Sequence, residues 1–208
     1  MGKVSTGSKD LDGLFNYDSS TLTTIYGEAA TGKTTLALLL TIAQARKKKV
    51  LSIDTENGFS SERLKQLTSD YKDFIGNIVR VHPASFEEQE KIILNIPEKF
   101  FSAVVIDTIG FFYRLEVKQD PYKTNKSLDV QLRKLTELAK KEVFVLMTNQ
   151  VYASLDGKIN VVGGEMMKNW SRCLVALSKN PRKLKVEKPF ELEVLFDIKE
   201  KGIFRREF

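Results

Sequence analysis

Residues 27–34 have the types and spacing of a phosphate-binding loop. They read Gly27-Glu28-Ala29-Ala30-Thr31-Gly32-Lys33-Thr34, which fits the pattern G-x-x-x-x-G-K-T. The glycines let the backbone curl so that its N–H groups can hold the β-phosphate of a nucleoside triphosphate. Lys33 would bridge the β- and γ-phosphates, and the hydroxyl of Thr34 would bind Mg²⁺. The motif predicts a nucleoside triphosphate site, which we extend to Thr35.

The sequence on either side of this loop supplies the strand and the helix that the motif requires. Residues 22–26 form a β-type run, and residues 35–43 form an apolar run long enough for a buried helix. The positive end of that helix dipole adds to the attraction for phosphate. An ordinary Gly-rich turn is the alternative, and these flanks make it much the weaker interpretation.

Three more polar residues follow β-type runs and could act on the phosphates. Asp107 ends a hydrophobic run, the arrangement of a Walker B carboxylate that holds Mg²⁺. Glu56 could orient or deprotonate the water that attacks the γ-phosphate, and Gln150 could sense that phosphate. Each residue alone could simply cap the next loop. Together with the phosphate loop they favour a catalytic site at the carboxyl ends of parallel strands.

Apolar β-type runs alternate with amphipathic helical runs along most of the chain. We expect strands at residues 22–26, 50–54, 78–81, 103–107 and 143–147, and helices at 35–43, 60–67, 85–99 and 127–141. A polar and aromatic loop is expected over residues 108–126. After Cys173 the pattern changes to short strands, including 192–198 and 203–205. The sequence therefore predicts an α/β fold with a mostly parallel sheet, helices on both faces and antiparallel strands at the C-terminal edge.

Composition limits the class of protein. A length of 208 residues, with 42% hydrophobic and 29% charged residues, is typical of one soluble globular domain spanning 1–208. No stretch approaches a membrane span and no signal peptide is evident, so we expect a cytoplasmic protein. The single cysteine, Cys173, excludes an internal disulfide and a cysteine-based metal site.

The net charge of +6 is unevenly distributed. Residues 158–208 contain 12 Lys/Arg and 7 Asp/Glu, which accounts for +5 of the total. Such an excess is often only a matter of solubility. Beside a candidate active site it weakly favours a polyanionic partner.

Several segments resemble the RecA/RadA recombinase family. They are residues 5–12, the phosphate loop, the segment Asp54-Thr55-Glu56-Asn57-Gly58-Phe59-Ser60-Ser61-Glu62-Arg63-Leu64 and residues 148–151. The resemblance covers nearly the whole chain and is greatest to the RadB group, the short archaeal paralogues. It implies a RecA-like P-loop NTPase core without an N-terminal helix-hairpin-helix domain.

The resemblance also implies roles for single residues. Glu56 matches the catalytic glutamate, Gln150 matches the glutamine that senses the γ-phosphate, and Arg63 matches the arginine that stacks on adenine. The implied cofactors are ATP and Mg²⁺, held by the loop residues, with Thr34 and Asp107 on the metal. We expect Glu56, Lys33 and Gln150 to act in catalysis.

Two segments correspond to the DNA-facing loops of this family. The residues expected to contact DNA are Phe112, Tyr113, Arg114, Tyr152, Lys158 and Lys168. Aromatic and cationic side chains suit stacking on bases and pairing with phosphates. For Phe111 and Phe112, packing against the sheet is about as good an interpretation, and Trp170 fits the core better than a stacking platform.

The function implied is that of an ATP- and DNA-binding accessory protein of DNA repair and homologous recombination, with weak ATPase activity. Its implied partners are single-stranded or branched DNA, the main archaeal recombinase and a Holliday-junction resolvase, with a homo-oligomer also compatible. The chain departs from the family at residues 15–20 and 186–190, which counts against strand-exchange filaments. Two alternatives stay open: a filament-forming strand-exchange recombinase, and a RecA-like signalling ATPase or kinase that does not bind DNA.

Overall fold

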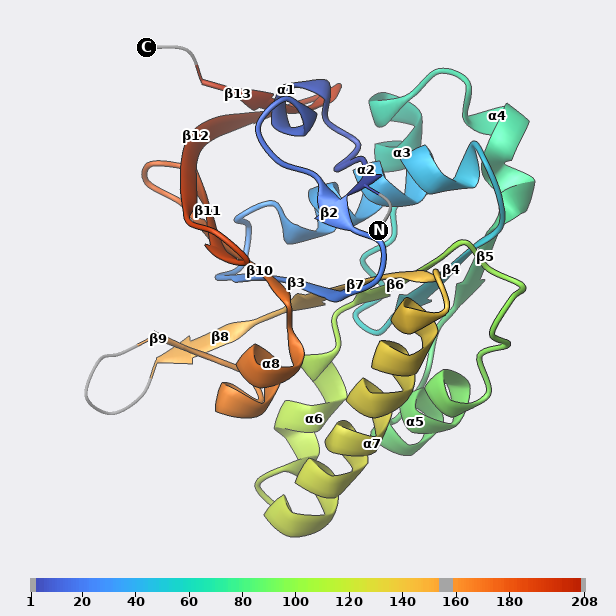
Figure 1. Ribbon diagram of the computed structural model, residues 1–208, viewed down its shortest axis with the longest axis vertical. Helices are drawn as coiled ribbons and strands as arrows, with labels where there is room; N and C mark the ends of the chain where they lie inside the picture. Colours follow the sequence, from blue (N-terminus) through green and yellow to red (C-terminus); the bar gives the residue numbers. More distant parts are fainter. Residues whose placement is uncertain (1–2, 154–158, 207–208) are drawn as a thin grey trace.

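A nine-stranded sheet forms the centre of the molecule (Figure 1). The computed structural model describes residues 3–153 and 159–206. Its central strands run parallel, in the order β10 (Cys173–Ser178), β3 (Leu22–Gly27), β7 (Phe144–Asn149), β6 (Ala103–Asp107), β4 (Val50–Asp54) and β5 (Ile78–Val81). Beyond β10, the strands β11 (Lys183–Lys188), β12 (Leu192–Lys199) and β13 (Gly202–Arg205) pair antiparallel. The predicted sheet is confirmed.

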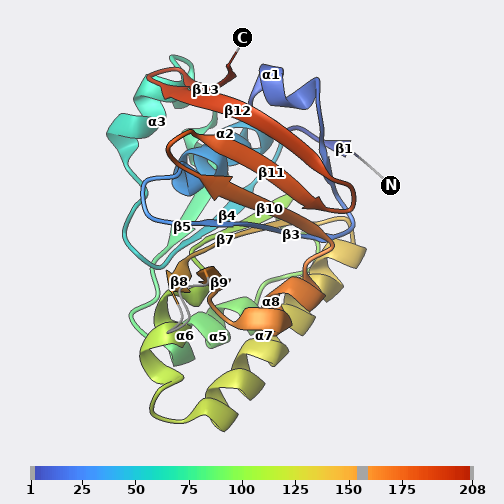
Figure 2. The ribbon, with the colours of Figure 1, turned by 90° about the vertical axis from the view of Figure 1, so that its left-hand side faces the viewer.

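Helices cover both faces of this sheet (Figures 1 and 2). One face carries α1 (Lys9–Asp12), α2 (Lys33–Ala45), α3 (Ser61–Leu67), α4 (Tyr71–Phe74) and the 3-10 turn Ile75–Asn77. The other carries α5 (Phe86–Leu94), α6 (Gly110–Glu116), α7 (Pro121–Lys140) and α8 (Gly164–Trp170). Figure 2 shows that β10 to β13 rise at one edge of the sheet and curve beside α2.

Two hydrophobic cores follow from this layering. The central strands are apolar on both sides because helices cover both faces, as in β6, where four of five residues are buried. On one face Leu36 and Leu40 of α2 are fully buried. On the other, α7 buries Leu128, Leu132 and Leu135, which share one side of the helix at spacings of three and four residues.

The prediction of a loop over residues 108–126 is wrong for most of its length, because α6 and the start of α7 occupy it. Pro121 suits the first turn of α7, where Asp120 accepts a hydrogen bond from the N–H of Lys123 at 2.9 Å. The helix expected over residues 85–99 begins as predicted, with Ser85 accepting from the N–H of Glu88 at 3.1 Å. It ends at Leu94, earlier than expected, since Pro97 disfavours helix in the residue before it.

Two short antiparallel pairs lie outside the main sheet. β1 (Lys3–Val4) pairs with β2 (Tyr17–Asp18). β8 (Val151–Ala153) pairs with β9 (Ile159–Val161) and projects from the end of β7 (Figure 1).

None of the helices in the described ranges has the length and apolarity to cross a membrane.

Candidate nucleotide site and nucleic-acid interface

The loop between β3 and α2 forms a cradle for an anion. Gly32 caps α2 with a φ of 108°, and among the described residues no side chain caps this helix. The positive φ is the backbone angle that favours glycine here, and an added Cβ would also lie 2.7 Å from Cδ1 of Ile198, a side-chain tip that would have to move. The first-turn N–H groups of a 13-residue helix therefore remain available to a phosphate.

Lys33 folds over this loop. Its Nζ donates to the carbonyl oxygens of Gly27 at 2.9 Å and Glu28 at 2.7 Å. Burial lowers the pKa of the Lys33 ammonium, although Asp107 and Glu56 favour its charged form. The ammonium group thus lies where the motif places the phosphates, held by carbonyl groups that a phosphate oxygen could replace.

Thr34 and Asp107, the predicted Mg²⁺ ligands, are brought together. The hydroxyl of Thr148 donates to Oδ1 of Asp107. Burial raises the pKa of the Asp107 carboxyl, while hydrogen bonds from Thr148 and Thr34 oppose that rise. A hydroxyl and a carboxylate are the oxygen ligands that Mg²⁺ prefers, and Mg²⁺ usually keeps several waters. Within the described ranges there is no cluster of three or more His, Cys, Asp or Glu residues that would make a closed metal site instead.

Glu56 and Gln150 meet across the sheet edge. Nε2 of Gln150 donates to Oε1 of Glu56 at 2.6 Å. Burial and the nearby Asp107 raise the pKa of the Glu56 carboxyl, while Arg114, Gln150 and Lys33 act in the opposite direction. The strand ends thus place a candidate base, a candidate sensor and a candidate metal ligand in one cluster.

Arg63 lies on α3 and its guanidinium is held by the β12–β13 turn. NH1 donates to the carbonyl of Glu200 at 3.0 Å and NH2 donates to that of Lys199 at 2.9 Å. These bonds attach α3 to the C-terminal hairpin and orient the guanidinium plane. Stacking of that plane on adenine stays a prediction.

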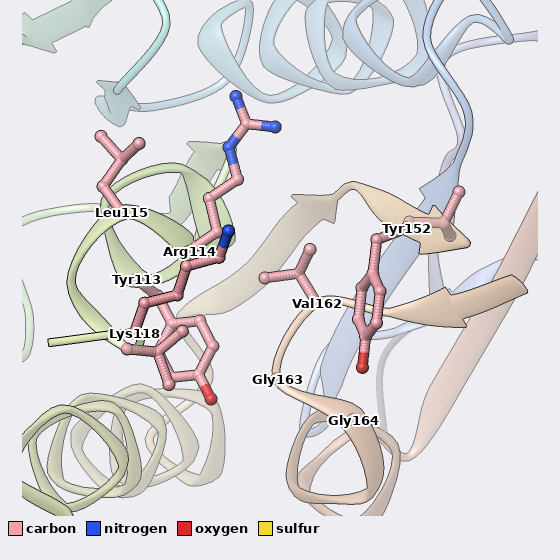
Figure 3. A pocket seen from close by; sticks show the side chains of 10 residues that line it. Tyr113, Arg114, Leu115, Lys118, Tyr152, Val162, Gly163 and Gly164 are labelled. Carbon is pink, nitrogen blue, oxygen red and sulfur yellow. The ribbon is translucent and has the colours of Figure 1, made fainter. Parts of the chain in front are cut away.

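A second hollow, of about 790 Å³, opens between α6 and the β8–β9 hairpin (Figure 3). Three of the residues predicted to contact DNA line it: Tyr113, Arg114 and Tyr152. Figure 3 shows Arg114 and Lys118 on one side, the ring of Tyr152 on the other and Val162 between them. The remaining lining residues that the structure describes are Leu115, Val117, Val151, Gly163 and Gly164, so no acidic side chain lines the described part of the wall.

The other residues predicted to contact DNA lie elsewhere. Phe112 is partly buried against the core and meets Phe111 edge-to-face, with 4.9 Å between ring centroids. Lys168 lies on α8 and forms an ion pair with Glu165 at 2.9 Å. Trp170 also packs against the core, as expected, and its Nε1 donates to Asp129 at 3.0 Å. Lys158 lies outside the described residues.

Within the cavity, Tyr113 is mostly buried and its hydroxyl donates to Asn125 at 2.8 Å. Only part of this ring is available to a ligand. Tyr152, at 51% exposure, is the aromatic side chain best placed for stacking.

The sequence patterns did not reveal two cations beside the phosphate loop. Lys179 forms an ion pair with Glu28 at 3.2 Å, and Arg182 donates to the carbonyl of Ala30 at 2.9 Å. Both come from the β10–β11 turn, which lies beside the loop because β10 pairs with β3. Only the order of the strands in the sheet could have indicated that these cations lie beside the phosphate loop. That order cannot be predicted from local sequence patterns.

Comparison with known proteins matches this arrangement to one family. A Rad51 family model matches residues 1–205. This chain belongs to the Rad51 family. Its family relatives include the "DNA repair and recombination protein RadB" of Methanocaldococcus jannaschii, 37% identical over 203 residues, which covers 91% of this chain and 95% of the relative.

Other Rad51-family relatives agree. The protein of the same name from Thermococcus sibiricus is 39% identical over 169 residues, covering 76% of this chain and 72% of the relative. A solved structure described as "Crystal structure of the RadB recombinase" superposes with a TM-score of 0.81 at 30% identity, covering 98% of this chain and all of that one. The expected resemblance to the RadB group and the RecA-like fold are both confirmed. A Rad51-family core is that of a P-loop ATPase, which binds nucleotide together with Mg²⁺.

Proposed function

We propose that this chain is an ATP- and DNA-binding accessory protein of DNA repair and homologous recombination, and that it hydrolyses ATP slowly with Mg²⁺. One observation carries the proposal: Gln150 contacts Glu56 at the nucleotide site and is also the residue before β8. Residues of β8 line the hollow between α6 and the β8–β9 hairpin, which we call the basic cavity because Arg114 and Lys118 also line it. The names of the relatives, DNA repair and recombination proteins, support the same process.

In the proposed reaction, Glu56 orients the attacking water and accepts its proton. Lys33 donates to oxygens of the β- and γ-phosphates, and Gln150 donates to the γ-phosphate. Mg²⁺, held by Thr34 and Asp107, would neutralise part of the phosphate charge when bound. Because the Gln150 amide donates to Oε1 of Glu56, it must leave that carboxylate before it can donate to the γ-phosphate, and we expect this step to slow turnover.

In the proposed DNA contact, Arg114 and Lys118 pair with phosphates and Tyr152 stacks on a base. The role of the protein would be to help the main recombinase and to modulate the processing of branched DNA. The same proposal includes a homo-oligomeric state of the chain. It also includes a Holliday-junction resolvase as a partner.

Direct binding measurements test this function. ATP affinity should be lost in Lys33→Ala and kept in Lys48→Ala, an exposed lysine after α2. Affinity for single-stranded, duplex and branched DNA should fall in Tyr152→Ala and in an Arg114→Glu/Lys118→Glu variant, and stay unchanged in Tyr122→Ala, a tyrosine of α7 that is 80% exposed.

Three results would contradict the proposal. Normal ATP affinity in Lys33→Ala would remove the nucleotide assignment. Salt-independent or undetectable DNA binding would favour the signalling alternative. ATP-dependent filaments on single-stranded DNA, with turnover stimulated by DNA, would favour a strand-exchange recombinase.

A further inference from the structure

Residues 55–59, which we call the Glu56 loop, follow β4 and are fixed at their start by Thr55. The N–H of Thr55 donates to the carbonyl of Asp107 at 2.9 Å. Its hydroxyl donates to the carbonyl of Thr108 at 2.8 Å and accepts from the N–H of the same residue at 2.8 Å. These three hydrogen bonds attach the residue before Glu56 to the end of β6, the strand that carries the candidate metal ligand.

Asp54, the last residue of β4, fixes the other end of the Glu56 loop. Its carboxylate accepts from the N–H of Gly58 at 2.9 Å and from the N–H of Phe59 at 3.0 Å. The residue is only 2% exposed. A carboxylate buried this deeply is costly unless a cation and hydrogen-bond donors compensate its charge. The shape of the loop therefore depends on how this buried charge is compensated.

Arg80, on the edge strand β5, supplies the compensating cation. Its NH2 donates to Oδ2 of Asp54 at 2.7 Å and to Oδ1 of Asn57 at 2.6 Å. Its guanidinium also lies over the ring of Phe59, 5.2 Å from the ring centroid. Among the described residues Arg80 is the cation paired with Asp54. One side chain thus contacts both the anchor of the loop and two residues of the loop.

The pairing of β5 with β4 explains why Arg80 can reach these groups. Arg80 lies opposite Ser52 in this parallel pair. Side chains alternate between the two faces of a strand, so Ser52 and Asp54 point to the same face as Arg80. Asp54 is two residues further along β4, within reach of a side chain as long as arginine. Neither the sequence patterns nor the proposed chemistry gives this arginine a role.

We infer that Arg80 is a positioning residue for hydrolysis, which holds the Glu56 loop in the geometry that lets Glu56 orient the attacking water. The inference rests on the proposed function, in which Glu56 is the base. Arg80 contacts this loop and not the phosphate loop, so it acts on turnover rather than on the binding of ATP. Misplacement of a reacting group by about 1 Å can lower a rate about 10²-fold, so a modest shift of the loop is enough.

The first test compares steady-state turnover with equilibrium binding of ATP. Arg80→Met keeps much of the length of the side chain and removes its charge and its donors. We expect kcat to fall about 10–100-fold while the affinity for ATP is kept. Arg80→Lys places a cation beside Asp54 again and should recover most of the lost rate.

Arg46→Met is the matched control. NH2 of Arg46 donates to Oδ1 of Asp70 at 2.7 Å and to the hydroxyl of Thr68 at 2.8 Å, and the guanidinium lies 5.6 Å from the centroid of the Phe74 ring. This arginine makes the same kinds of contact at the end of α2 opposite to the phosphate loop. Its kcat should stay unchanged. An equal fall of kcat in Arg46→Met and Arg80→Met, or no recovery in Arg80→Lys, would overturn the inference.

A second measurement observes the loop itself. Hydrogen exchange of the N–H groups of Gly58 and Phe59, followed by NMR, should be about 10-fold or more faster in Arg80→Met than in the unmodified protein. In Arg46→Met it should be unchanged. Unchanged exchange in folded Arg80→Met would overturn the inference, whatever the turnover.

Two further outcomes are separated by this design. If Arg80→Met does not fold, Arg80→Gln takes its place, because the glutamine amide can still donate to Asp54, and it should show the same changes in kcat and exchange. If Glu56→Gln turns over normally, the proposed base is wrong. Exchange at Gly58 and Phe59 needs no turnover, and it then still decides whether Arg80 holds the loop.

Discussion

Nε2 of Gln150 lies 2.6 Å from Oε1 of Glu56 and donates a hydrogen bond to it. The two residues follow β7 and β4, which are separated in the sheet by β6 and its terminal Asp107. The pair therefore spans the strand that carries the candidate metal ligand. In this arrangement the proposed sensor is hydrogen-bonded to the proposed base, and an incoming γ-phosphate would have to compete for the same amide.

Glu56→Gln should leave ATP affinity unchanged and lower the rate constant of hydrolysis by about 10²–10⁴-fold, the usual contribution of a general base. The amide keeps the size of the side chain but cannot accept the proton of water. Steady-state turnover with an equilibrium nucleotide-binding assay separates the two effects. Glu62→Gln, on the exposed face of α3, is the control and should turn over normally. Equal turnover in both variants would rule out Glu56 as the base.

The pH profile of hydrolysis should report the surroundings of Glu56. Burial and Asp107 raise the pKa of this carboxyl, and the positive charge of Arg114 counteracts them. Since the base acts when ionised, activity is lost as pH falls through this pKa, and the raised pKa moves that loss to higher pH. In measurements of kcat/KM without DNA, Arg114→Ala should move the loss of activity to a still higher pH, because the variant lacks the positive charge that lowers this pKa. Lys118→Ala removes a neighbouring cation of the cavity wall and serves as the comparison. If Arg114→Ala moved the loss of activity to a lower pH, the expectation would be contradicted.

Asp107→Asn should stabilise the nucleotide-free protein while abolishing Mg²⁺-dependent hydrolysis. Burial raises the pKa of Asp107 in the folded state, so its ionisation opposes folding as pH rises above the pKa of the unfolded chain, and the penalty is present at neutral pH. Asparagine stays neutral. We expect the Tm of the nucleotide-free protein to rise.

Thermal unfolding without nucleotide measures this gain. The control is Asp197→Asn, at a half-buried aspartate whose pKa is lowered by its hydrogen bond with Arg206 and whose ionised form is therefore favourable. The Tm of this variant should not rise. A lower Tm in Asp107→Asn would show that the carboxylate stabilises the fold.

Leu40→Ala should destabilise the layer that positions the phosphate loop. Leu40 is fully buried on α2, and a leucine-to-alanine change in such a core costs about 2–5 kcal/mol. Urea unfolding followed by circular dichroism gives the free energy of unfolding. Leu94→Ala makes the same chemical change on α5 at a side chain that is 38% exposed. Similar losses in both variants would mean that Leu40 has no special part in this core.

Much of the sheet could be predicted because its signals are local. Runs such as residues 103–106 are apolar throughout, and in an α/β pattern a continuous apolar run indicates a strand covered on both faces. The α6 helix was missed because its short sequence carries no strong helix signal, and burial of Tyr113 and packing of Phe112 against the core favour it in the fold. Tertiary burial of this kind overrides local propensity.

By itself the sequence determined the phosphate loop, the polar residues at the strand ends and most of the order of helices and strands, with α6 as an exception. These features depend on neighbours along the chain, or on the rule that parallel strands end at one edge. Only the tertiary structure decided that Arg63 is held by the β12–β13 turn, that Lys179 and Arg182 lie beside the phosphate loop, and that Arg80 of β5 contacts the loop after β4. Those contacts join residues far apart in the chain, and their geometry depends on which strands pair and how closely backbones approach, which local spacing does not specify.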